Sequence, residues 1–456
     1  MVETNTKSLK DAELKEKLQD LRRTDNYTNL VYLAQTWLFL ALVIGGTVAF
    51  YLYREAAGWS WWWNVPVTLF AILAVGAGQH QLTGLTHEAA HHILLKNRYL
   101  NELISDWFCM FPIFSTTHHY RLQHLAHHQF VNDPVRDPNF CQLQVNGHWR
   151  DFPLTKREFY KTLLKQLWLP NLFRYLGSQA QQNAVHFGHN PYLRKGWRQS
   201  KTPIRIGFIY FFTLAGLVTV LAHFDQVLLL AVLPPTAWAG IMLYYWFLPA
   251  DKYHQSRVHP VISLRWTTLM RMTFVTLLVT GLGWISLLTA RPAGVYFLLL
   301  WMVPLFTSFS FYMMIRQLVQ HGNGDRGWLT NTRVFFISKI INYCILPFGQ
   351  DLHLPHHVFA TVPHYRLQEL HDLLMEYPEY RQQAVIVEGY FLPKHRPQTR
   401  PTVVDVLGPQ YSPKERHDVH IDASVLEGFE VEEKDEIIRE GEQEVQRSQD
   451  HAKQPV

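Results

Sequence analysis

The sequence predicts an all-α integral membrane protein with about six transmembrane helices and a cytosolic helical cap. Three observations support this fold class. Six apolar runs are each about as long as the 20 residues that a helix needs to cross a bilayer. Hydrophobic residues make up 48% of the 456 positions and charged residues only 17%, a balance unusual for a soluble protein. The 25 histidines are clustered, which indicates a metal site on the polar part of the chain.

The chain begins with a charged segment, residues 1–30, which contains LKDAELKEKLQDLRR. It has no apolar stretch of the kind found in secretory signals, so we expect a short cytosolic amphipathic helix. The apolar runs follow, and the prolines inside two of them are compatible with membrane helices. The runs cover residues 31–53, 65–86, 205–223, 227–249, 273–290 and 295–315.

Lysine and arginine are concentrated between residues 87 and 202, whereas the short connections near Arg54, Asp225 and Arg291 carry few of them. Cytoplasmic loops of membrane proteins carry the excess of basic residues. We therefore expect the long loop and both termini in the cytosol, with the protein in a bacterial inner membrane or the endoplasmic reticulum. The three cysteines are widely spaced, which argues against a disulfide framework and agrees with a reducing compartment.

Composition divides the chain into the cytosolic segment 1–30, a membrane catalytic domain over 31–390 and a polar acidic tail over 391–456. From about Lys414 the tail has few apolar anchors, so we expect it to be solvated or weakly helical. Within the cytosolic loop, residues 158–177 alternate basic and bulky apolar side chains. This pattern fits a helix at the membrane interface and equally well an ordinary packing helix.

Three histidine clusters, the histidine boxes, share one spacing and fall on the same side of the predicted membrane. The first follows the pattern H-x-x-x-H at the end of the second apolar run, and the other two follow H-x-x-H-H. On a helix, positions i, i+3 and i+4 share a face, so each box presents its imidazoles together. The boxes consist of His87 and His91; His124, His127 and His128; and His353, His356 and His357.

Imidazole suits zinc, copper, iron and nickel. A single catalytic zinc uses about three protein ligands, so eight boxed histidines fit two metals that keep positions free for oxygen. The first box also spells H-E-x-x-H, the motif of zinc proteases, but a membrane protease would leave the other two boxes unused. A metal transporter would place ionisable ligands inside its crossings, where His80 is nearly alone.

Other polar residues near the boxes are weaker candidates. His92, His118 and His119 fall off the faces of their boxes, so we expect them to support ligands or to be structural. His254 and His259 follow the fourth apolar run, where we expect a surface position.

Carboxylates beside the boxes can orient a ligating imidazole through its second ring nitrogen. Asp133 and Asp137 in NDPVRDPNF are candidates for this role, although both stand beside prolines and also fit turns. Asp351, just before the last box, is a further candidate.

The sequence resembles the membrane fatty acid desaturase family, which includes hydroxylases and ketolases. The resemblance rests on HEAAHH, YRLQHLAHHQFVNDPVRDP, QHGNGDRGWLTNTR and HLPHHVFATVPHYRLQELH, and with the membrane pattern it covers roughly residues 30–375. It implies that two iron ions lie at the cytosolic mouth of a helical bundle, where O2 and two electrons are used to attack an unactivated C–H bond. The implied ligands are the eight boxed histidines.

The resemblance adds a ninth candidate ligand. Several desaturases carry E-H-G followed by N-T-R, and His321 occupies the histidine position here, with Gln320 in place of the glutamate. Gln317 stands one turn earlier on the same face, where its amide could hold a metal-bound water. The last box departs from the family at Pro355 and Ala360, and we expect the proline to alter the local backbone geometry.

The resemblance implies a membrane lipid or acyl substrate and oxygen as co-substrate; we expect no nucleic acid partner. The chain has no haem-binding HPGG segment, no G-x-G-x-x-G fingerprint and no cysteine set for an iron–sulfur cluster. We therefore expect a separate electron donor, a ferredoxin or cytochrome b5. A lipid or carotenoid hydroxylase or ketolase on the same diiron site is the main alternative to a desaturase.

Overall fold

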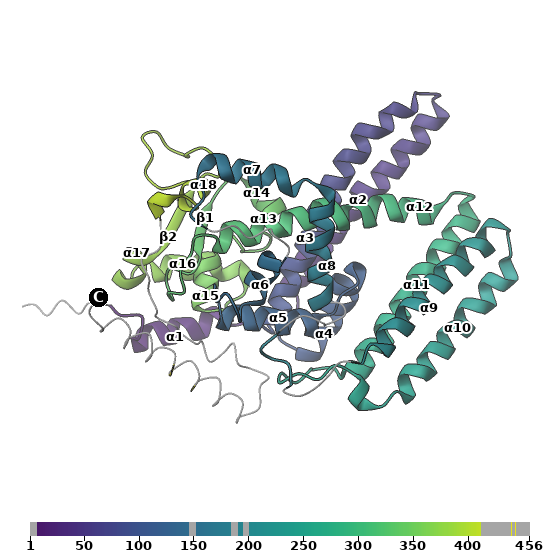
Figure 1. Ribbon diagram of the computed structural model, residues 1–456, viewed down its shortest axis with the longest axis horizontal. Coiled ribbons are helices and arrows are strands. Elements are labelled where there is room, and N and C mark those ends of the chain that lie inside the picture. The colour runs from purple at the N-terminus through teal and green to yellow at the C-terminus, as the bar shows by residue number, and fades with distance from the viewer. Residues whose placement is uncertain are drawn as a thin grey trace, which may run out of the picture.

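The computed structural model describes residues 7–145, 152–183, 190–194, 200–411, 439 and 443. The acidic tail expected from about Lys414 therefore lies outside the described residues, apart from two positions. Within the described part, six helical segments are long and apolar enough to cross a membrane. They confirm the predicted all-α membrane architecture (Figure 1). These segments are Thr28–Ala56, Trp61–Ala90, Thr202–His223, Val227–Phe247, Leu264–Thr289 and Ala293–His321.

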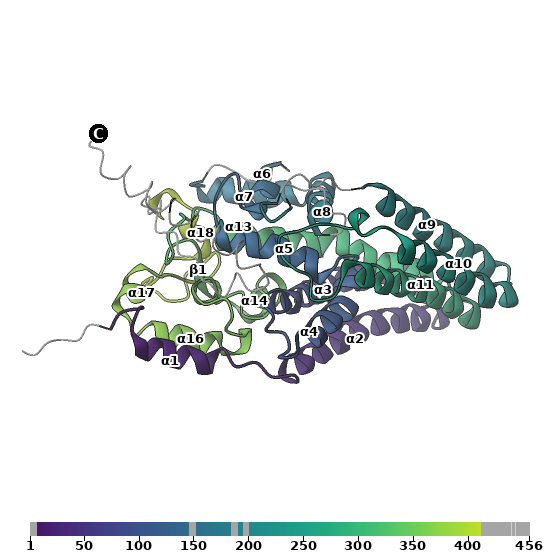
Figure 2. The same ribbon diagram turned by 90° about the horizontal axis from the view of Figure 1, so that it is seen from below.

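The crossings form two groups that project from the cap in Figures 1 and 2. Helix α2 (Thr28–Ala56) pairs with α3 (Asn64–Ala90), and α9 (Thr202–His223), α10 (Val227–Phe247) and α11 (Leu264–Thr289) pack on one another. Many large apolar side chains on these helices are exposed, as expected for surfaces that face lipid.

The sixth crossing links the two groups and is not a uniform α-helix. It consists of α12 (Ala293–Phe297), the π-helical turns η5 (Leu298–Met302) and η6 (Leu305–Phe309), and α13 (Ser310–His321). Pro304 lies between the π-helical turns; proline lacks the N–H of the regular ladder, so a local change of hydrogen bonding is expected there. The crossing nevertheless continues to His321.

Helix α3 approaches the sixth crossing closely at Gly76. A Cβ atom on Gly76 would lie 2.0 Å from Ser308 Oγ and 2.7 Å from the Phe309 backbone nitrogen. Ser308 in turn donates a 2.5 Å hydrogen bond to the Ile72 carbonyl. The absence of a side chain at Gly76 therefore lets the two helices that carry His87 and His321 run side by side.

The cap gathers around the ends of α3 and α13. Its first half contains α1 (Ala12–Leu21), α4 (Arg98–Ser105), α5 (Thr117–Gln129), α6 (Pro138–Val145), α7 (Lys156–Gln166) and α8 (Leu169–Asn183). Its second half contains α14 (Lys339–Ile345), α15 (His353–Val358), α16 (Leu367–Leu374), α17 (Pro378–Gln383) and α18 (Val403–Val406). The strands β1 (Arg333–Phe336) and β2 (Val385–Glu388) pair with each other in parallel. The sequence did not predict these strands.

The expected N-terminal amphipathic helix is present as α1. Its Leu14, Leu18 and Leu21 are buried in one apolar cluster with residues of α16 and the α15 region. The N-terminal segment is therefore part of the cap.

The expected helix over 158–177 is divided into α7 and α8. Their junction exposes a run of apolar side chains: Leu164, Leu167, Trp168, Leu169 and Phe173. Lys161 and Lys165 stand beside this run. An exposed apolar surface flanked by lysines is typical of a helix at the membrane interface, so the structure favours that alternative over simple packing.

Beyond residue 390 the chain still packs against the cap. Helix α18 begins with a capping box between Thr402 and Asp405, and Val403, Val406 and Leu407 are buried. Asn323, just after α13, donates hydrogen bonds to the carbonyls of this segment. The packed chain thus extends past the domain boundary at 390 that composition suggested.

Candidate metal centre

Helix α3 carries the first histidine box to its very end. His91 is the last residue before the turn, and His92 adopts a left-handed backbone with φ 59°. The His92 N–H bonds the Ala89 carbonyl and the Ile93 N–H bonds the Glu88 carbonyl, the pattern of a Schellman helix end. The left-handed conformation of His92 ends the helix directly after His91. His87 and His91 therefore share one helix face, and His92 lies off that face.

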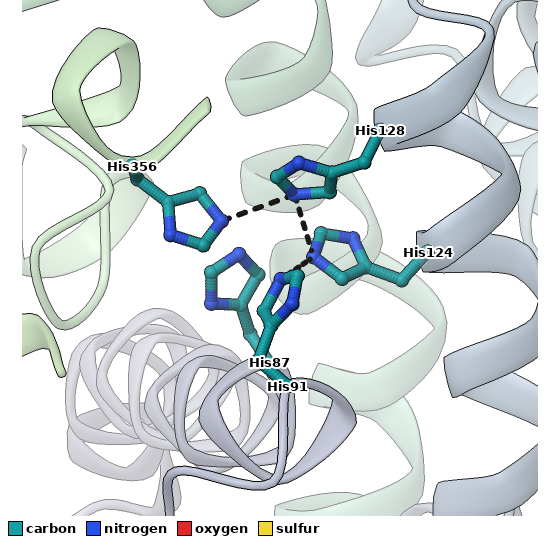
Figure 3. A group of neighbouring side chains, drawn as sticks. All are labelled: His87, His91, His124, His128 and His356. Atoms are coloured by element: carbon teal, nitrogen blue, oxygen red, sulfur yellow. Dashed lines mark hydrogen bonds between the residues drawn. The ribbon is translucent and has the colours of Figure 1, made fainter. Parts of the chain in front are cut away.

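Five imidazoles from three helices meet in the first group. His91 Nε2 lies 2.8 Å from His124 Nε2, and His128 Nε2 lies 3.1 Å from the Nε2 atoms of both His124 and His356. Figure 3 shows these rings together with that of His87. One nitrogen from each of the five lies within 4.8 Å of all the others, so the group joins α3, α5 and α15.

Four imidazoles form the second group, which joins α5, α13 and α15. His321 Nε2 lies 3.1 Å from His127 Nε2 and 3.0 Å from His353 Nε2, and His353 Nε2 lies 3.1 Å from His357 Nε2. Their ligand nitrogens also lie within 4.8 Å of one another. The structure thus brings together all eight boxed histidines and His321.

Each H-x-x-H-H box is shared between the groups. His124 and His128 belong to the first group and His127 to the second; His353 and His357 belong to the second and His356 to the first. On a helix, position i+4 is displaced by about 40° from i, whereas i+3 is displaced by about 60° in the opposite sense. The i and i+4 residues therefore point to one site and the i+3 residue to its neighbour.

The nitrogen spacings fit metal ions. With a bond of about 2.1 Å, two nitrogens at 90° around a metal are about 3.0 Å apart, and at the tetrahedral angle about 3.4 Å apart. The six closest Nε2–Nε2 distances run from 2.8 to 3.1 Å. Both ring nitrogens of His87 are buried without a hydrogen-bond partner in the described part of the chain. These observations fit metal ions held by imidazole nitrogens.

Burial favours the neutral form of the boxed histidines. Removal from water lowers the pKa of His124, His128, His353, His356 and His357 well below the usual value, and neighbouring imidazoles add to the effect. The neutral imidazole is the form that coordinates a metal. The site is therefore in its metal-binding protonation state at neutral pH.

Pro355 does not disturb the last box, contrary to the expectation from the sequence. Helix α15 begins at His353, so Pro355 is its third residue. The first four N–H groups of a helix have no intrahelical partner, and proline loses nothing there. The His356 N–H still bonds the Leu352 carbonyl at 3.2 Å, and the Pro355 carbonyl accepts from the Phe359 N–H at 2.9 Å.

Two histidines of the second group have a partner for their other ring nitrogen. His127 Nδ1 lies 3.0 Å from both carboxylate oxygens of Asp137, and His321 Nδ1 lies 3.2 Å from the Asn331 carbonyl. Asp137 also accepts from the Asn132 and Asn139 N–H groups. Asp133 instead pairs with Arg136 and Arg326, so only Asp137 of these two contacts a boxed histidine.

The remaining candidates contact other groups. Gln317 accepts a 2.8 Å hydrogen bond from the Tyr175 hydroxyl, and the Asp351 carboxylate accepts from Asn342. His92 Nδ1 lies 4.0 Å from Glu102 Oε1, and burial with nearby Arg121 lowers the pKa of His92 to about 2. The structure therefore gives Gln317, Asp351 and His92 positions around the histidine groups but not inside them.

Four further histidines lie away from both groups. His118 Nε2 is 3.2 Å from Ser256 Oγ, and the His119 and His254 rings pack 5.2 Å apart. His254 is buried, so its expected surface position is wrong, because the loop after α10 folds back onto α5. His259 is exposed, as expected.

The sequence analysis missed the residue that joins the first two boxes. Arg121 is fully buried and donates to the Ala89 and Ala90 carbonyls at the end of α3, as well as to the Glu102 carboxylate. It stands three residues before His124, on the same side of α5. The signal in the sequence that could have identified Arg121 was a charged residue on the same face of the helix as the histidine box.

A cavity of about 540 Å³ lies between the α9–α11 group and the rest of the protein. Its wall is mostly apolar and includes Phe211, Met272 and Leu305, while Tyr120, Tyr175 and Arg316 line it on the side of the metal centre. The Tyr120 ring stacks on His124 with centroids 5.5 Å apart. Tyr120 therefore separates the cavity from the first histidine group.

A second opening, of about 760 Å³, reaches the first histidine group from another side. His91 and His92 lie at its base, and it is lined by Arg22, Arg23, Thr24, Ile93, Lys96, Arg98 and Thr361. The described lining contains four basic side chains and no acidic one.

The comparison with protein families agrees with this geometry. The model described as fatty acid desaturase matches residues 60–284 and 250–388, which span both histidine groups and five of the six crossings. The chain belongs to the fatty acid desaturase family. The resemblance seen in the histidine boxes is confirmed.

Two curated relatives carry desaturase names. The dihydrorhizobitoxine desaturase of Bradyrhizobium elkanii is 24% identical over 415 residues, which cover 87% of this chain and 88% of that protein. The Delta(5) fatty acid desaturase fat-4 of Caenorhabditis elegans is 30% identical over 126 residues, or 27% of this chain and 25% of that one. The similarity to the first relative extends over nearly the whole of both chains.

The arrangement of Glu88 argues against a zinc protease in this desaturase-family chain. In the H-E-x-x-H motif the glutamate is the general base beside the metal. Here the Glu88 carboxylate accepts a 2.8 Å hydrogen bond from the His364 backbone N–H and belongs to neither histidine group. The motif in this chain supplies two imidazoles and a buried structural carboxylate.

We expect Asp137→Asn to weaken metal binding at the second group by about 10- to 100-fold, because an orienting carboxylate is lost from a ligand imidazole. Metal content after dialysis against a graded chelator would measure the change. Asp133→Asn, four residues earlier and paired with arginines, is the matched control. Equal metal retention in the two variants would contradict the role of Asp137.

Proposed function

We propose that this protein is a membrane-bound non-haem diiron desaturase that introduces a C=C bond into an acyl or related apolar chain. The supporting observation is the pair of adjacent histidine groups, one of five and one of four imidazoles, in each of which the ligand nitrogens lie within 4.8 Å of one another. The reaction would consume the CH2–CH2 unit, O2, two electrons and two protons, and would yield CH=CH and two waters. Two iron ions would supply the oxygen activation that no side chain can provide.

In this proposal all nine histidines are metal ligands. Helices α5 and α15 each contribute to both groups, which would hold the two ions next to each other. Asp137 and the Asn331 carbonyl would fix the orientation of His127 and His321. The apolar residues around the groups would keep bulk water from the reacting carbon atoms.

The apolar cavity beside Tyr120 is the proposed substrate site. Its volume of about 540 Å³ is within the range of about 300–1,000 Å³ found for ligand pockets. Phe208 and Phe212 of α9 line it and are also exposed on the outer surface of the bundle. A chain dissolved in the bilayer would therefore have a short apolar route into the cavity.

The basic opening beside His91 is the proposed docking site for the electron donor. Four cationic side chains surround a passage that ends at a proposed metal ligand, which suits an acidic ferredoxin or cytochrome b5. The concentration of basic residues in the cap segments supports a cytosolic orientation. We propose that the cap and the N-terminal segment face the cytosol, in a bacterial inner membrane or the endoplasmic reticulum.

Expression in a host without the activity, followed by lipid analysis and metal measurement, tests this function. We expect a new unsaturated product and about two irons per purified chain. The His128→Ala variant should give no unsaturated product. Desaturase names on both relatives support unsaturation over hydroxylation on this site. A hydroxylated product would assign the oxygenase alternative, and stoichiometric zinc with full activity would overturn the diiron proposal.

A further inference from the structure

Arg316 is a buried cation at the inner end of the apolar cavity. Arg316 is only 7% exposed and lines the cavity. It belongs to α13, the helix that carries His321. The Tyr120 hydroxyl interacts with its guanidinium. Two of its nitrogens, Nε and Nη1, have no hydrogen-bond partner in the part of the chain that the structure describes.

Other buried arginines of the chain are fully engaged by the protein. Arg121 bonds the Glu102 carboxylate and two helix-end carbonyls, and Arg333 bonds the Val319 and Gly322 carbonyls. Arg316 has no carboxylate partner among the described residues. A buried charge without a partner is costly, because desolvation is not offset by an opposite charge. A ligand that places an anionic oxygen in the cavity would offset this desolvation cost.

The position of Arg316 determines where that oxygen would lie. Tyr120 touches Arg316 on one side and stacks on His124 on the other. An anionic group at Arg316 would therefore be one aromatic ring away from the first histidine group. The opposite end of the cavity reaches the lipid-facing side of α9 at Phe208 and Phe212, and suits the apolar part of the same molecule.

We propose that Arg316 binds a carboxylate carried on an apolar chain, and that the substrate lies with this carboxylate inward and its apolar tail toward the bilayer. This inference rests on the proposed function and specifies its substrate class. The carbon to be oxidised would then be only a few bonds from the carboxylate, because both must lie next to Tyr120. A planar carboxylate is the anion that a guanidinium recognises best among organic groups on such a chain.

Binding of simple probes to the purified full-length protein in a nonionic detergent tests the proposal. Hexanoate is compared with hexan-1-ol and with acetate by calorimetry, before and after removal of metal with a chelator, so that direct coordination to iron is separated from binding at Arg316. We expect hexanoate to bind about 10- to 100-fold more tightly than the alcohol in the metal-free protein, the range for charge-assisted hydrogen bonds. Acetate should bind more weakly than hexanoate because it lacks the apolar chain.

Two variants locate the carboxylate. Arg316→Met should reduce the preference for hexanoate over the alcohol to less than about threefold, and Arg316→Lys, which keeps the charge, should retain part of it. Lys252→Met is the matched control, since Lys252 lines the same cavity at its exposed end and pairs with Asp251. Because an unpaired buried charge is removed, Arg316→Met should melt at the same or a higher temperature than the unaltered protein.

Three results would overturn the proposal. The first is an unaltered protein that binds hexanoate no better than hexan-1-ol. The second is loss of the preference in Lys252→Met with retention in Arg316→Met, which would place the carboxylate at the cavity mouth. The third is a large drop in the melting temperature of both Arg316 variants, which would make Arg316 structural. Iron content and product analysis of the unaltered protein are independent of these readouts, so failure here leaves the desaturase proposal standing.

Discussion

Replacing His127 and His128 together by alanine is expected to abolish turnover and to remove most of the iron. The two residues are neighbours in sequence, but His128 belongs to the first histidine group and His127 to the second. One double variant therefore removes a ligand from both proposed ions. His128 is also 3.1 Å from both His124 and His356, so its loss leaves those imidazoles without the ligand between them.

The single variants separate the two groups. His128→Ala should lower iron mainly at the first group and His127→Ala at the second, with about one iron lost in each case if the groups load separately. Metal analysis and Mössbauer spectroscopy of iron-57 protein would measure both content and site. His118→Ala is the matched control, because His118 is buried on the same helix, lies outside the boxes and contacts Ser256. Full iron content in the double variant would refute the ligand assignment.

Replacing Arg121 by methionine is expected to destabilise the protein by about 3–5 kcal/mol, because it leaves a buried carboxylate unpaired. Arg121 is completely buried and bonds Glu102 and the last carbonyls of α3. Those carbonyls belong to Ala89 and Ala90, between His87 and the end of the helix. The variant should therefore lose iron along with stability, even though Arg121 itself touches no metal ligand nitrogen. Thermal unfolding in detergent and metal content are the measurements.

Two comparisons make the Arg121 experiment specific. Arg136→Met removes an arginine from a partly exposed pair with Asp133, and should change stability by about 1 kcal/mol or less. The double variant Arg121→Met with Glu102→Met also removes the carboxylate that the single variant leaves unpaired. It should therefore be less destabilised than Arg121→Met alone. If the double variant were destabilised by more than the sum of the two single variants, the ion pair between Arg121 and Glu102 would not be the source of the stabilisation.

The features that the sequence predicted well are those set by local pattern. Six apolar runs of bilayer length predicted six crossings, and the spacing of the boxes placed each set of imidazoles on one side of a helix. His321 could be predicted only from the family resemblance, since a single histidine before a glycine forms no spacing pattern of its own. Its place in the second group depends on the close contact between α3 and the sixth crossing at Gly76.

The features that the sequence could not predict depend on contacts between distant segments. Spacing alone did not show that His127 and His128 belong to different groups, because that division depends on α3 supplying imidazoles to the first group and α13 to the second. Pro355 was expected to distort its box, but the effect of a proline depends on the residue at which the helix begins. Arg121 and Arg316 are both buried, and only their partners in the structure distinguish them. The Arg121 guanidinium is paired with Glu102, whereas two nitrogens of Arg316 have no hydrogen-bond partner in the described part of the chain.

Helix α15, which contributes to both histidine groups, is also the last to leave the ribosome of the four helices that contribute histidines to them. All crossings precede it in the chain, so the membrane part can be inserted before either group is complete. A nascent or truncated chain that stops before His353 lacks proposed ligands for both proposed ions, so neither group is complete. If the proposed iron binds the completed chain, it would stabilise the fold by mass action. Iron supply would consequently act on the lifetime of the protein after synthesis as well as on its rate of turnover.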